Sequence, residues 1–352
     1  MANLSKDQID AQLKKAGVAT TKEVDISFDD INSFGSKDSI RKMFKSAANY
    51  NQMLSERLTL INESLTAAIP FTRENLYLFC AYTGSGKSTV AANISYPLWK
   101  QKKKVLIISN EEPELDVIFR IACLEKGYKF NDFKKGRMSQ EQQMECFRLF
   151  EDITEYVKVI DVVYKDGITT KIEGVKKLME NVKGQGFSCV LIDYYQLIKD
   201  SINDKERTRY DVLNDLRVWL GQYIKGCEIP VVLFVQLYSQ GKRPSKDIDM
   251  RIKECSAIVE PASVIIEIVP NIEEEYSDFI IHKDRFGVAG SRIMCPFRNG
   301  RFLKQQTERE RTERKLDKLV APVPQAVSIG GLGNTLSTGA DYDAGQKLAK
   351  MS

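Results

Sequence analysis

The segment from Ala81 to Ser88 constrains this chain more than any other part of its sequence. It follows an apolar run, Leu76–Cys80, that predicts a buried strand, and it precedes Thr89–Trp99, which predicts a helix. A glycine-containing loop in this position can turn backbone N–H groups toward an anion, and the helix N-terminus adds partial positive charge. The loop therefore predicts a nucleoside triphosphate site. Its candidate binding residues are Ala81, Tyr82, Thr83, Gly84, Ser85, Gly86, Lys87, Ser88 and Thr89.

Two side chains of this loop have separate predicted roles. Lys87 is placed to reach the β- and γ-phosphates, and the Ser88 hydroxyl to take a coordination position on Mg²⁺. Ala81 stands where such loops often begin with glycine, and this position tolerates alanine because it only has to be small. The plain alternative is a Gly/Ser turn that happens to precede a lysine. The strand before it and the helix after it argue against that interpretation.

Composition restricts the class of protein without identifying it. With 352 residues, 43% hydrophobic and 28% charged, the chain has the make-up of a soluble globular protein with one large domain and appendages. The net charge of +4 is too small to indicate a polyanion partner, so nucleic-acid contacts must depend on local patches. Seven scattered cysteines and one histidine make a zinc site unexpected and favour reduced thiols in a cytoplasm. No stretch approaches ~18 uninterrupted apolar residues, so neither export nor a membrane span is expected.

Strand-like and helix-like segments alternate from Leu58 to about Leu303. This alternation predicts an α/β fold with a mainly parallel sheet flanked by helices, in which ligands bind where the strands end. The further expected strands are Val105–Ser109, Val157–Val163, Cys189–Asp193 and Pro230–Val235. The further expected helices are one between Pro113 and Gly127, Ile172–Val182 and Val212–Tyr223. Four strand ends carry the phosphate loop, Glu111, Asp193 and Gln236, which predicts a single site.

Three of these polar positions have candidate roles in phosphate chemistry. Asp193, after four apolar residues, has the position of a Mg²⁺-organising carboxylate, although strands also end in aspartate as a plain turn residue. Glu111 is a candidate to orient and deprotonate the attacking water, with Glu112 as its rival. Either glutamate could instead be an acid favoured by a helix dipole. Gln236 is a candidate sensor of the γ-phosphate, or alternatively a buried polar residue at a strand end.

Several short runs, which occur in the family's order, resemble the RecA-like motor domain of DnaB-type hexameric replicative helicases. Asp193-Tyr194-Tyr195-Gln196-Leu197 resembles the family's Asp-Tyr-Leu-Gln-Leu, and Ser109-Asn110-Glu111 resembles its Ser-Leu-Glu, with Arg120 at the matching spacing. The other similar runs are Phe133–Ser139, Pro230–Leu237, Lys242–Pro244, Lys253–Ile258 and His282–Gly287. The resemblance covers most of residues 58–304. Such an ordered set is far more specific than the phosphate loop alone.

The resemblance implies an ATP- and Mg²⁺-dependent enzyme that works as a homo-hexamer on single-stranded DNA. It favours Glu111 over Glu112 as the catalytic carboxylate. It also implies that Lys283 and Arg285 insert into the neighbouring subunit's ATP site. Without the resemblance, these two residues would be taken for ordinary solvated charges.

The residues around this pair predict a β-hairpin. Phe279–Lys283 and Ser291–Cys295 have the pattern of two strands, and the turn between them contains glycine. A hairpin of this kind could project from the domain. It would then present Lys283 and Arg285 to a neighbouring subunit.

The resemblance also implies partners, and the sequence departs from the family in places. A primase, a loader and a single-strand-binding protein are the implied partners, and 5′→3′ polarity is implied with them. Tyr238–Ser239 stand where the family often has arginine, and Lys253 and Ser256 stand where it usually has arginine and glycine. Residues 1–50 are too short for the family's N-terminal helical domain. We therefore expect a trimmed, phage-encoded member, in the cytoplasm of a bacterial cell or a phage-infected host.

The expected DNA contacts lie in two polar segments, one after the strand that ends in Asp193 and one after the strand that ends in Gln236. Lys and Arg in such loops can touch phosphates without reading bases, whereas a charge run is more commonly a solvated loop. The expected contact residues are Lys205, Arg207, Lys242, Arg243, Lys253 and Glu254. Lys199, Arg209, Lys246 and Arg251 lie in the same segments.

The sequence predicts a division of the chain into three segments and one overall function. Residues 1–57 form a helical or linker segment that is either a frayed tail or docked on a neighbouring subunit, residues 58–304 the motor domain, and residues 305–352 a charged helix and a flexible tail. The expected function is an ATP-driven ring that translocates on single-stranded DNA and unwinds the duplex at a replication fork. A RecA-like strand-exchange filament is the first alternative. A catalytically inactive scaffold is the second, and the residues that argue against it are Lys87, Ser88, Glu111, Asp193 and Arg285.

Overall fold

The computed structural model describes residues 57–161, 170–199, 208–238, 247–287 and 289–305. All of them belong to one compact unit of the chain, Met1–Gln306. The short N-terminal helices and the C-terminal tail expected from the sequence lie outside the described residues, as do the basic residues Lys205, Arg207, Lys242 and Arg243. No helix in the described ranges is long and apolar enough to cross a bilayer.

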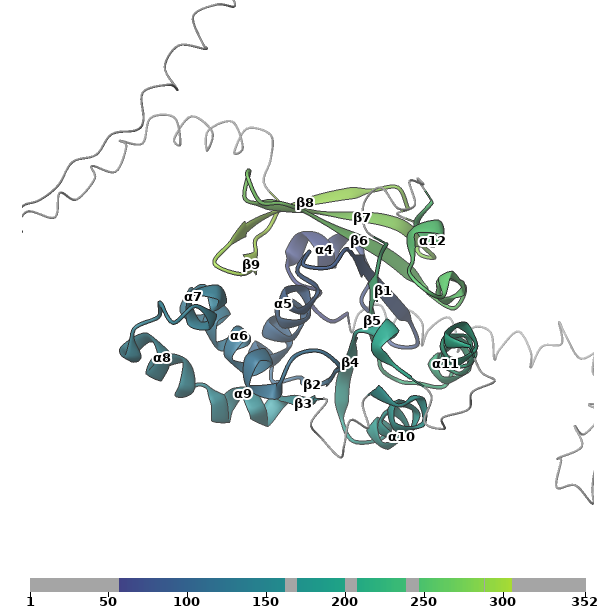
Figure 1. Cartoon of the computed structure of the whole chain (residues 1–352), viewed down its shortest axis with the longest axis horizontal. Coiled ribbons are helices and arrows are strands. Elements are labelled where there is room, and N and C mark those ends of the chain that lie inside the picture. Colours follow the sequence, from purple (N-terminus) through teal and green to yellow (C-terminus); the bar gives the residue numbers. More distant parts are fainter. Residues whose placement is uncertain (1–56, 162–169, 200–207, 239–246, 288, 306–352) are drawn as a thin grey trace, which may run out of the picture. The chain divides into compact units, whose positions relative to one another are not determined.

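A nine-stranded sheet forms the centre of the described unit, in the order β3-β2-β4-β5-β1-β6-β7-β8-β9 (Figure 1). Neighbours from β3 to β6 are parallel, and β7 to β9 continue the sheet in antiparallel fashion. The predicted mainly parallel α/β sheet is therefore confirmed. The strands are β1 Leu76–Ala81, β2 Lys104–Ser109, β3 Val157–Ile160, β4 Phe187–Asp193, β5 Val231–Gln236, β6 Val264–Asn271, β7 Tyr276–Asp284, β8 Arg292–Arg298 and β9 Arg301–Phe302.

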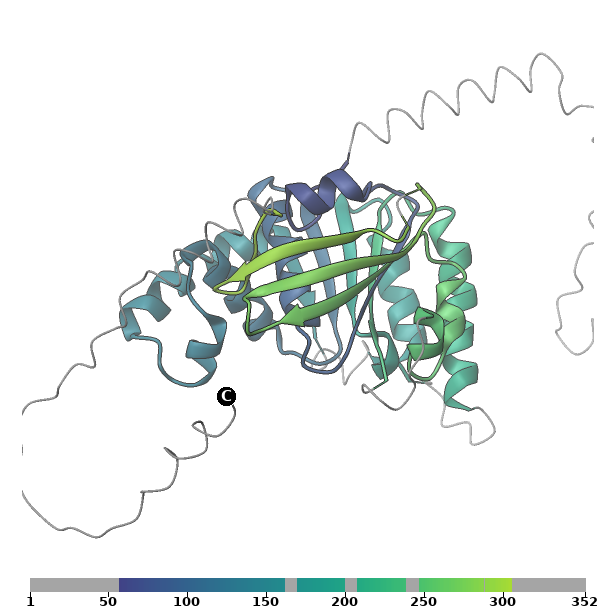
Figure 2. The same ribbon diagram turned by 90° about the horizontal axis from the view of Figure 1, so that it is seen from above.

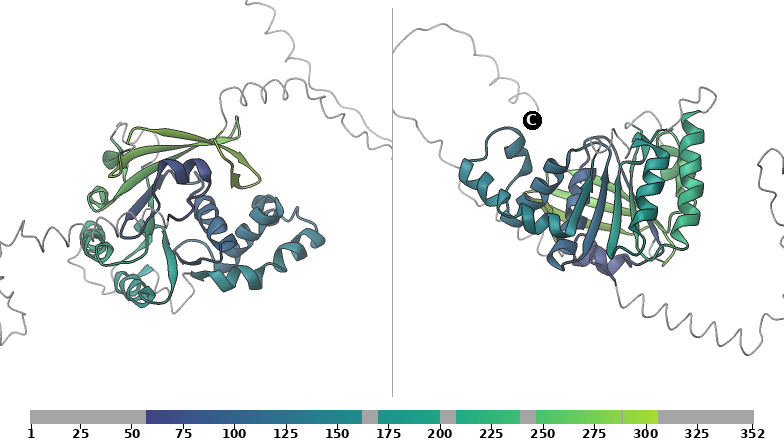
Figure 3. Two further views of the ribbon diagram at one scale, coloured as in Figure 1. Left: turned by 180° about the vertical axis from the view of Figure 1, so that it is seen from behind. Right: turned by 90° about the horizontal axis from the view of Figure 1, so that it is seen from below.

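Helices cover both faces of this sheet (Figures 1 and 2). The α-helices are α4 Glu63–Ala68, α5 Lys87–Lys100, α6 Glu114–Lys126, α7 Phe130–Lys134, α8 Gln140–Phe147, α9 Phe150–Tyr156, α10 Ile172–Val182, α11 Arg209–Ile224 and α12 Ile248–Arg251. The 3-10 helices include η2 Tyr195–Leu197 and η3 Ser256–Val259. Figure 3 shows α10 and α11 on the face of the sheet opposite to α5 and α6.

The central strand β1 contributes to two separate hydrophobic cores because alternate side chains of a strand point to opposite faces. Tyr77 and Phe79 pack in the core with α5 and α6. Leu76 and Leu78 pack in the core with α10 and α11. All four side chains are fully buried. This double burial explains why the strand is a continuous apolar run in the sequence.

Several element boundaries differ from the sequence-based expectation. The helix expected at Val212 begins earlier, at Arg209, because Thr208 and Asp211 form a capping box. The strand β3 ends at Ile160, and Val163 lies outside the described residues. Strand β6 and helices α7, α8 and α9 were not predicted. The capping box that opens α8, with Ser139 bonded to the backbone of Gln142, was a usable signal.

Candidate nucleotide site

The phosphate loop and three candidate residues from distant parts of the sequence lie together where the parallel strands of the sheet end. Strands β2, β4, β5 and β1 are consecutive neighbours in the sheet and all run in the same direction. Ser109 at the end of β2 is in register with Asp193, and Ala81 with Gln236. The phosphate loop, Glu111, Asp193 and Gln236 therefore gather where these strands end, as predicted for a parallel sheet.

The phosphate loop has a backbone that depends on its glycines. Gly84 and Gly86 have φ angles of 76° and 88°, in the left-handed region that side chains with a Cβ atom rarely adopt. Gly86 is also the N-cap of α5, so the first helical N–H groups face the loop. Lys87 is buried at the first position of α5, with its Nζ 5.1 Å from the ring centroid of Tyr194. The loop thus combines backbone N–H donors at a helix N-terminus with a lysine ammonium group.

Ser88 and Asp193 form a pair suited to a divalent cation. The Ser88 hydroxyl donates a hydrogen bond of 3.0 Å to Oδ2 of Asp193. Oδ1 of Asp193 is buried and has no hydrogen-bond partner among the described residues. Burial raises the pKa of the Asp193 carboxyl to about 6, against the lowering effect of the Ser88 hydrogen bond and the Lys87 charge. An oxygen pair with an unsatisfied buried acceptor fits Mg²⁺, which prefers oxygen ligands and binds few protein groups beside phosphates.

The structure distinguishes the two neighbouring glutamates. The Ser109 hydroxyl donates to the Glu112 carbonyl oxygen at 2.6 Å, and this contact holds the turn that carries both residues. The Glu112 carboxylate is ion-paired with Arg120 at 2.6 Å. The Glu111 side chain is exposed and makes no hydrogen bond or ion pair with any described residue. Glu111 is therefore the exposed, unpaired carboxylate of the two, whereas Oε2 of Glu112 is buried without a hydrogen-bond partner among the described residues.

Gln236 contacts the phosphate loop directly. Its side-chain amide Nε2 donates a hydrogen bond to the hydroxyl of Thr83. The backbone is tied to the same place, because Leu237 donates to the carbonyl oxygen of Ala81 at 2.9 Å. A group that enters the loop would meet the Gln236 amide.

Lys283 and Arg285 lie on the side of the sheet where the parallel strands begin, opposite to the phosphate loop. The backbone N–H of Arg285 donates to the carbonyl oxygen of Ser263. The backbone N–H of Ser263 in turn donates to the carbonyl oxygen of Leu76, at the start of β1. The phosphate loop follows the far end of β1, roughly 16 Å along the strand direction at about 3.3 Å per residue. Arg285 is exposed. It therefore cannot complete the phosphate site of its own chain.

The backbone after η3 holds this pair of cations. Lys283 Nζ donates to the carbonyl oxygens of Val259 at 2.8 Å and Glu260 at 3.3 Å, and Arg285 donates to the latter at 3.3 Å. Burial, followed by the nearby Arg285 charge, lowers the pKa of Lys283. The predicted hairpin is confirmed in β7 and β8, which are antiparallel neighbours.

The described residues from the expected DNA-binding segments have mixed surroundings. Lys253 is partly exposed, whereas the Glu254 carboxylate is paired with Arg209 at 2.9 Å. Arg251 is paired with Glu267 at 2.6 Å. Neither guanidinium group is a free cation, so Arg209 and Arg251 are structural in this fold.

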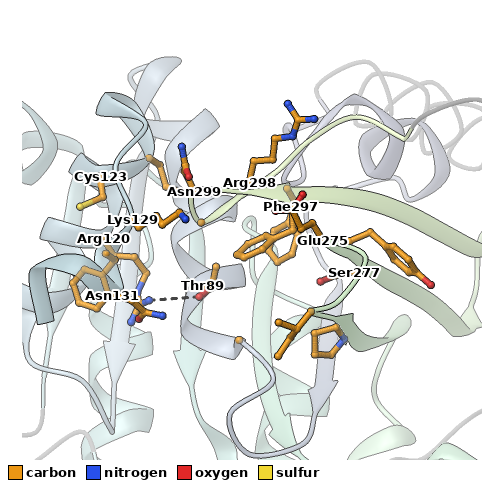
Figure 4. A pocket seen from close by; sticks show the side chains of 18 of the residues that line it. Thr89, Arg120, Cys123, Lys129, Asn131, Glu275, Ser277, Phe297, Arg298 and Asn299 are labelled. Carbon is orange, nitrogen blue, oxygen red and sulfur yellow. Dashed lines mark hydrogen bonds between the residues drawn. The ribbon is translucent and has the colours of Figure 1, made fainter. Parts of the chain in front are cut away.

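A cavity of about 620 Å³ opens beside the phosphate loop (Figure 4). Its walls come from the loop, from α6 and α7, and from the ends of β6, β7 and β8. The lining includes Gly84, Gly86, Thr89, Arg120, Phe130, Asn131, Pro270, Tyr276, Phe297, Arg298 and Asn299. Figure 4 shows Arg120 pointing toward Thr89, to which it donates at 3.5 Å. Apart from the loop and Arg120, sequence analysis singled out none of these residues, because only the fold brings the three segments together.

A family model described as "DnaB-like helicase C terminal domain" matches residues 63–301. The chain belongs to the DnaB-like helicase family. Members of this family are ATP-hydrolysing DNA helicases, so the enzyme class expected from the sequence is confirmed. The matching family is a helicase family and not the family of strand-exchange recombinases that was the first alternative. No curated protein sequence matches the chain significantly.

Solved structures agree with this fold. The ATPase domain of a phage helicase has a TM-score of 0.62 and 17% identity, and the match covers 77% of this chain and 100% of that domain. A DnaB-like replicative helicase, described with its interactions with primase, has a TM-score of 0.59 and 18% identity over 86% of this chain and 72% of that one. Both likenesses establish the RecA-like fold of this helicase.

An ion cluster centred on the buried Glu267 lies against the phosphate loop of this helicase. The Glu267 carboxylate on β6 accepts two hydrogen bonds of 2.6 Å from Arg251 and a contact of 2.7 Å from His282 Nε2. Arg251 also lies 3.4 Å from the Tyr82 hydroxyl. Burial alone would raise the pKa of Glu267, but the hydrogen bonds from His282 and Arg251 lower it below its ordinary value of 4.5.

Removing the charge of Glu267 should destabilise the helicase. Glu267→Gln leaves the partly buried Arg251 without its anion, and breaking such a pair costs up to about 3–5 kcal/mol. Urea unfolding at pH 7 measures the loss, and the exposed Glu273→Gln is the matched control. Because the folded-state pKa of Glu267 is depressed, its contribution is present above pH 4.5 and is lost as the pH falls through the folded-state pKa. The wild type and Glu267→Gln should therefore converge in stability at acid pH, and a constant difference would contradict this assignment.

Proposed function

We propose that this helicase assembles into a ring of six copies that hydrolyses ATP and moves along single-stranded DNA to separate the strands of a fork. The observation that carries the proposal is the placement of the phosphate loop and Arg285 at opposite edges of one sheet. A site that uses both groups needs two copies, and repeating that contact closes a ring when the rotation permits. A primase is a proposed partner, because a helicase of similar fold is described with one.

The proposed ATP site divides the work among a few side chains. Lys87 and the loop backbone bind the phosphates, and Ser88 and Asp193 hold Mg²⁺, which would neutralise charge on the phosphate oxygens. Glu111 orients and deprotonates the attacking water. Gln236, bonded to Thr83 in this structure, meets the γ-phosphate. Lys283 and Arg285 of one copy reach the γ-phosphate bound by the next.

The cavity beside the loop is proposed to take the nucleoside part of ATP. Its volume of about 620 Å³ is typical of a small-molecule site. Tyr276, Phe297 and Pro270 offer apolar surface for a base, and Asn131 offers an amide group. The cavity touches Gly84 and Gly86, so a base seated there can remain linked to phosphates in the loop.

Strand separation on a forked DNA duplex tests the proposed function. The wild type with ATP and Mg²⁺ should separate the strands, and electron microscopy should show closed rings. Lys87→Ala should form rings without separating strands. Filaments on DNA with strand exchange and no unwinding would instead favour a recombinase. No ATP hydrolysis in any condition would favour a scaffold.

Binding of single-stranded DNA should be electrostatic and independent of sequence. We consider a variant in which Lys242, Arg243 and Lys253 are all changed to Ala. The slope of log affinity against log salt concentration should become less steep by up to about 2, since each lost phosphate contact contributes roughly 0.7. Fluorescence anisotropy across a salt series measures the slope. The control removes the same charge at exposed Lys102, Lys103 and Lys104, at the start of β2. Equal slopes in wild type and the first variant would exclude this segment as the contact surface.

The flanking segments belong to the same proposal. We assign residues 58–304 to the motor domain, residues 1–57 to a helical linker, and residues 305–352 to a charged helix and tail. A loader or a single-strand-binding protein is a proposed partner of these segments. The proposed location is the cytoplasm of a bacterial cell or phage-infected host, where a replication fork is accessible.

A further inference from the structure

A buried glutamine lies between the nucleotide site and the proposed DNA-binding segment. Gln196 belongs to η2, directly after the β4 strand that ends in Asp193, and is only 6% exposed. Its Nε2 donates to the carbonyl oxygens of Gln236 at 3.0 Å and Lys253 at 3.1 Å. Its Oε1 accepts from the backbone N–H of Gln236 at 3.0 Å. Three of the four hydrogen-bonding positions of this amide are thus used on two backbone segments.

Arg209 connects the segment of Gln196 to Glu254, the residue after Lys253. Its guanidinium group donates to the carbonyl oxygens of Gln196 and Ile198, and it pairs with the Glu254 carboxylate at 2.9 Å. Glu254 has a φ angle of 71°, a conformation that costs a residue with a side chain free energy unless its surroundings hold it. Lys253 and Glu254 are therefore held from both sides, by Gln196 and by Arg209.

The same junction reaches the phosphate loop through Gln236. The side chain of Gln236 donates to Thr83, while its backbone N–H and C=O are both bonded to Gln196. A displacement of Gln236 by a bound γ-phosphate must either break these backbone bonds or carry Gln196 and Lys253 with it. The side chain of Gln196 is buried and its bonds to both backbone segments are partly buried, so breaking them costs more than moving with Gln236.

We infer that Gln196 is the positioning residue that couples nucleotide binding to DNA binding in this helicase. This inference rests on the proposed function, because it needs ATP at the loop and single-stranded DNA at Lys253. Gln196 touches neither ligand. The backbone N–H of Lys253 also donates directly to the Gln236 carbonyl oxygen at 3.1 Å, and Gln196 acts by bracing this contact so that the two backbone segments move as one unit.

The test measures the coupling itself, since loss of stability alone would not remove it. Fluorescence anisotropy gives the Kd of a labelled single-stranded oligonucleotide with and without a non-hydrolysable ATP analogue and Mg²⁺. The ratio of the two values in wild type should fall in the range of about 5–150 that is typical of coupled sites. In Gln196→Met, which has a similar volume and no amide, the ratio should fall to within about twofold of unity. The affinity for the analogue alone should stay close to wild type.

Two further variants keep the test decisive. Gln196→Glu retains the acceptor for Gln236 but replaces the donor amide with an oxygen facing two carbonyl groups, so it should also lose the coupling and is used if Gln196→Met does not fold. Tyr223→Phe removes a buried hydrogen bond of 2.6 Å to Met179 in the same core without touching the junction, and its ratio should equal that of wild type.

The outcomes separate this inference from the proposed function. If folded Gln196→Met or Gln196→Glu has the same ratio of the two Kd values as wild type, the role of Gln196 is wrong and the proposed function remains intact. If wild type binds both ligands but its Kd for DNA is the same with and without the analogue, the proposed coupling is also wrong. A wild type that binds neither the analogue nor DNA overturns the proposed function, and this inference with it.

Discussion

Glu111→Gln should bind ATP as wild type does and lose about 10²–10⁴-fold in the kcat of ATP hydrolysis, the range that a general base contributes. The amide keeps the shape of the side chain but cannot accept a proton from water. Glu111 is exposed and unpaired among the described residues, so its replacement breaks no contact that supports the fold. Steady-state hydrolysis gives kcat, and equilibrium binding of a labelled nucleotide gives the affinity.

Glu112→Gln is the matched control for this prediction. Its carboxylate is held by Arg120 at 2.6 Å, and Arg120 also lies over the ring of Phe130 at 4.1 Å and near Thr89. Losing that ion pair should disturb α6 and the cavity wall, and thus raise the KM for ATP more than it lowers kcat. If Glu112→Gln loses turnover and Glu111→Gln does not, the catalytic role belongs to Glu112.

Arg285→Ala should lower the rate of ATP hydrolysis by about 10³–10⁵-fold, the contribution of an arginine that stabilises a transferred phosphoryl group. ATP binding by the same subunits should remain, because Arg285 lies at the edge of the sheet remote from its own phosphate loop. Among the described residues, its side chain is held only by a contact of 3.3 Å to the Glu260 carbonyl oxygen, so its loss should leave the fold intact. Hydrolysis assays and thermal unfolding of the purified variant check both statements.

Mixing variants shows whether Arg285 acts on a neighbouring copy. In mixed rings of Arg285→Ala and Lys87→Ala subunits, some contacts pair an intact loop with an intact arginine, so mixing should restore measurable hydrolysis. The double variant mixed with either single variant offers no such contact and is the control. If labelled subunits of the two single variants co-assemble and the mixture stays inactive, Arg285 does not complete a neighbour's site.

Features that depend on a short stretch of sequence were determined by the sequence itself. The loop around Lys87 was recognisable because its glycines, its lysine and the flanking apolar runs are adjacent in the chain. Asp193 and Gln236 were recognisable for the same reason, since each ends an apolar run that must be buried. Because parallel strands end at one edge, the meeting of these residues followed from the fold class. The strand β6 was missed although its apolar run is interrupted only by Glu267, a charge that the fold satisfies with Arg251 and His282.

Only the tertiary structure decided which polar groups are occupied and which are free. Glu111 and Glu112 are neighbours with the same chemistry, and the pairing of Glu112 with Arg120 on α6 separates them. Gln196 bonds to backbone groups 40 and 57 residues away, and no local pattern encodes such partners. Hydrogen bonds and ion pairs between distant segments depend on ångström-scale placement by packing of the whole core. A local sequence pattern specifies secondary structure and the chemical type of a side chain, whereas that placement exists only once the sheet and both layers of helices have formed.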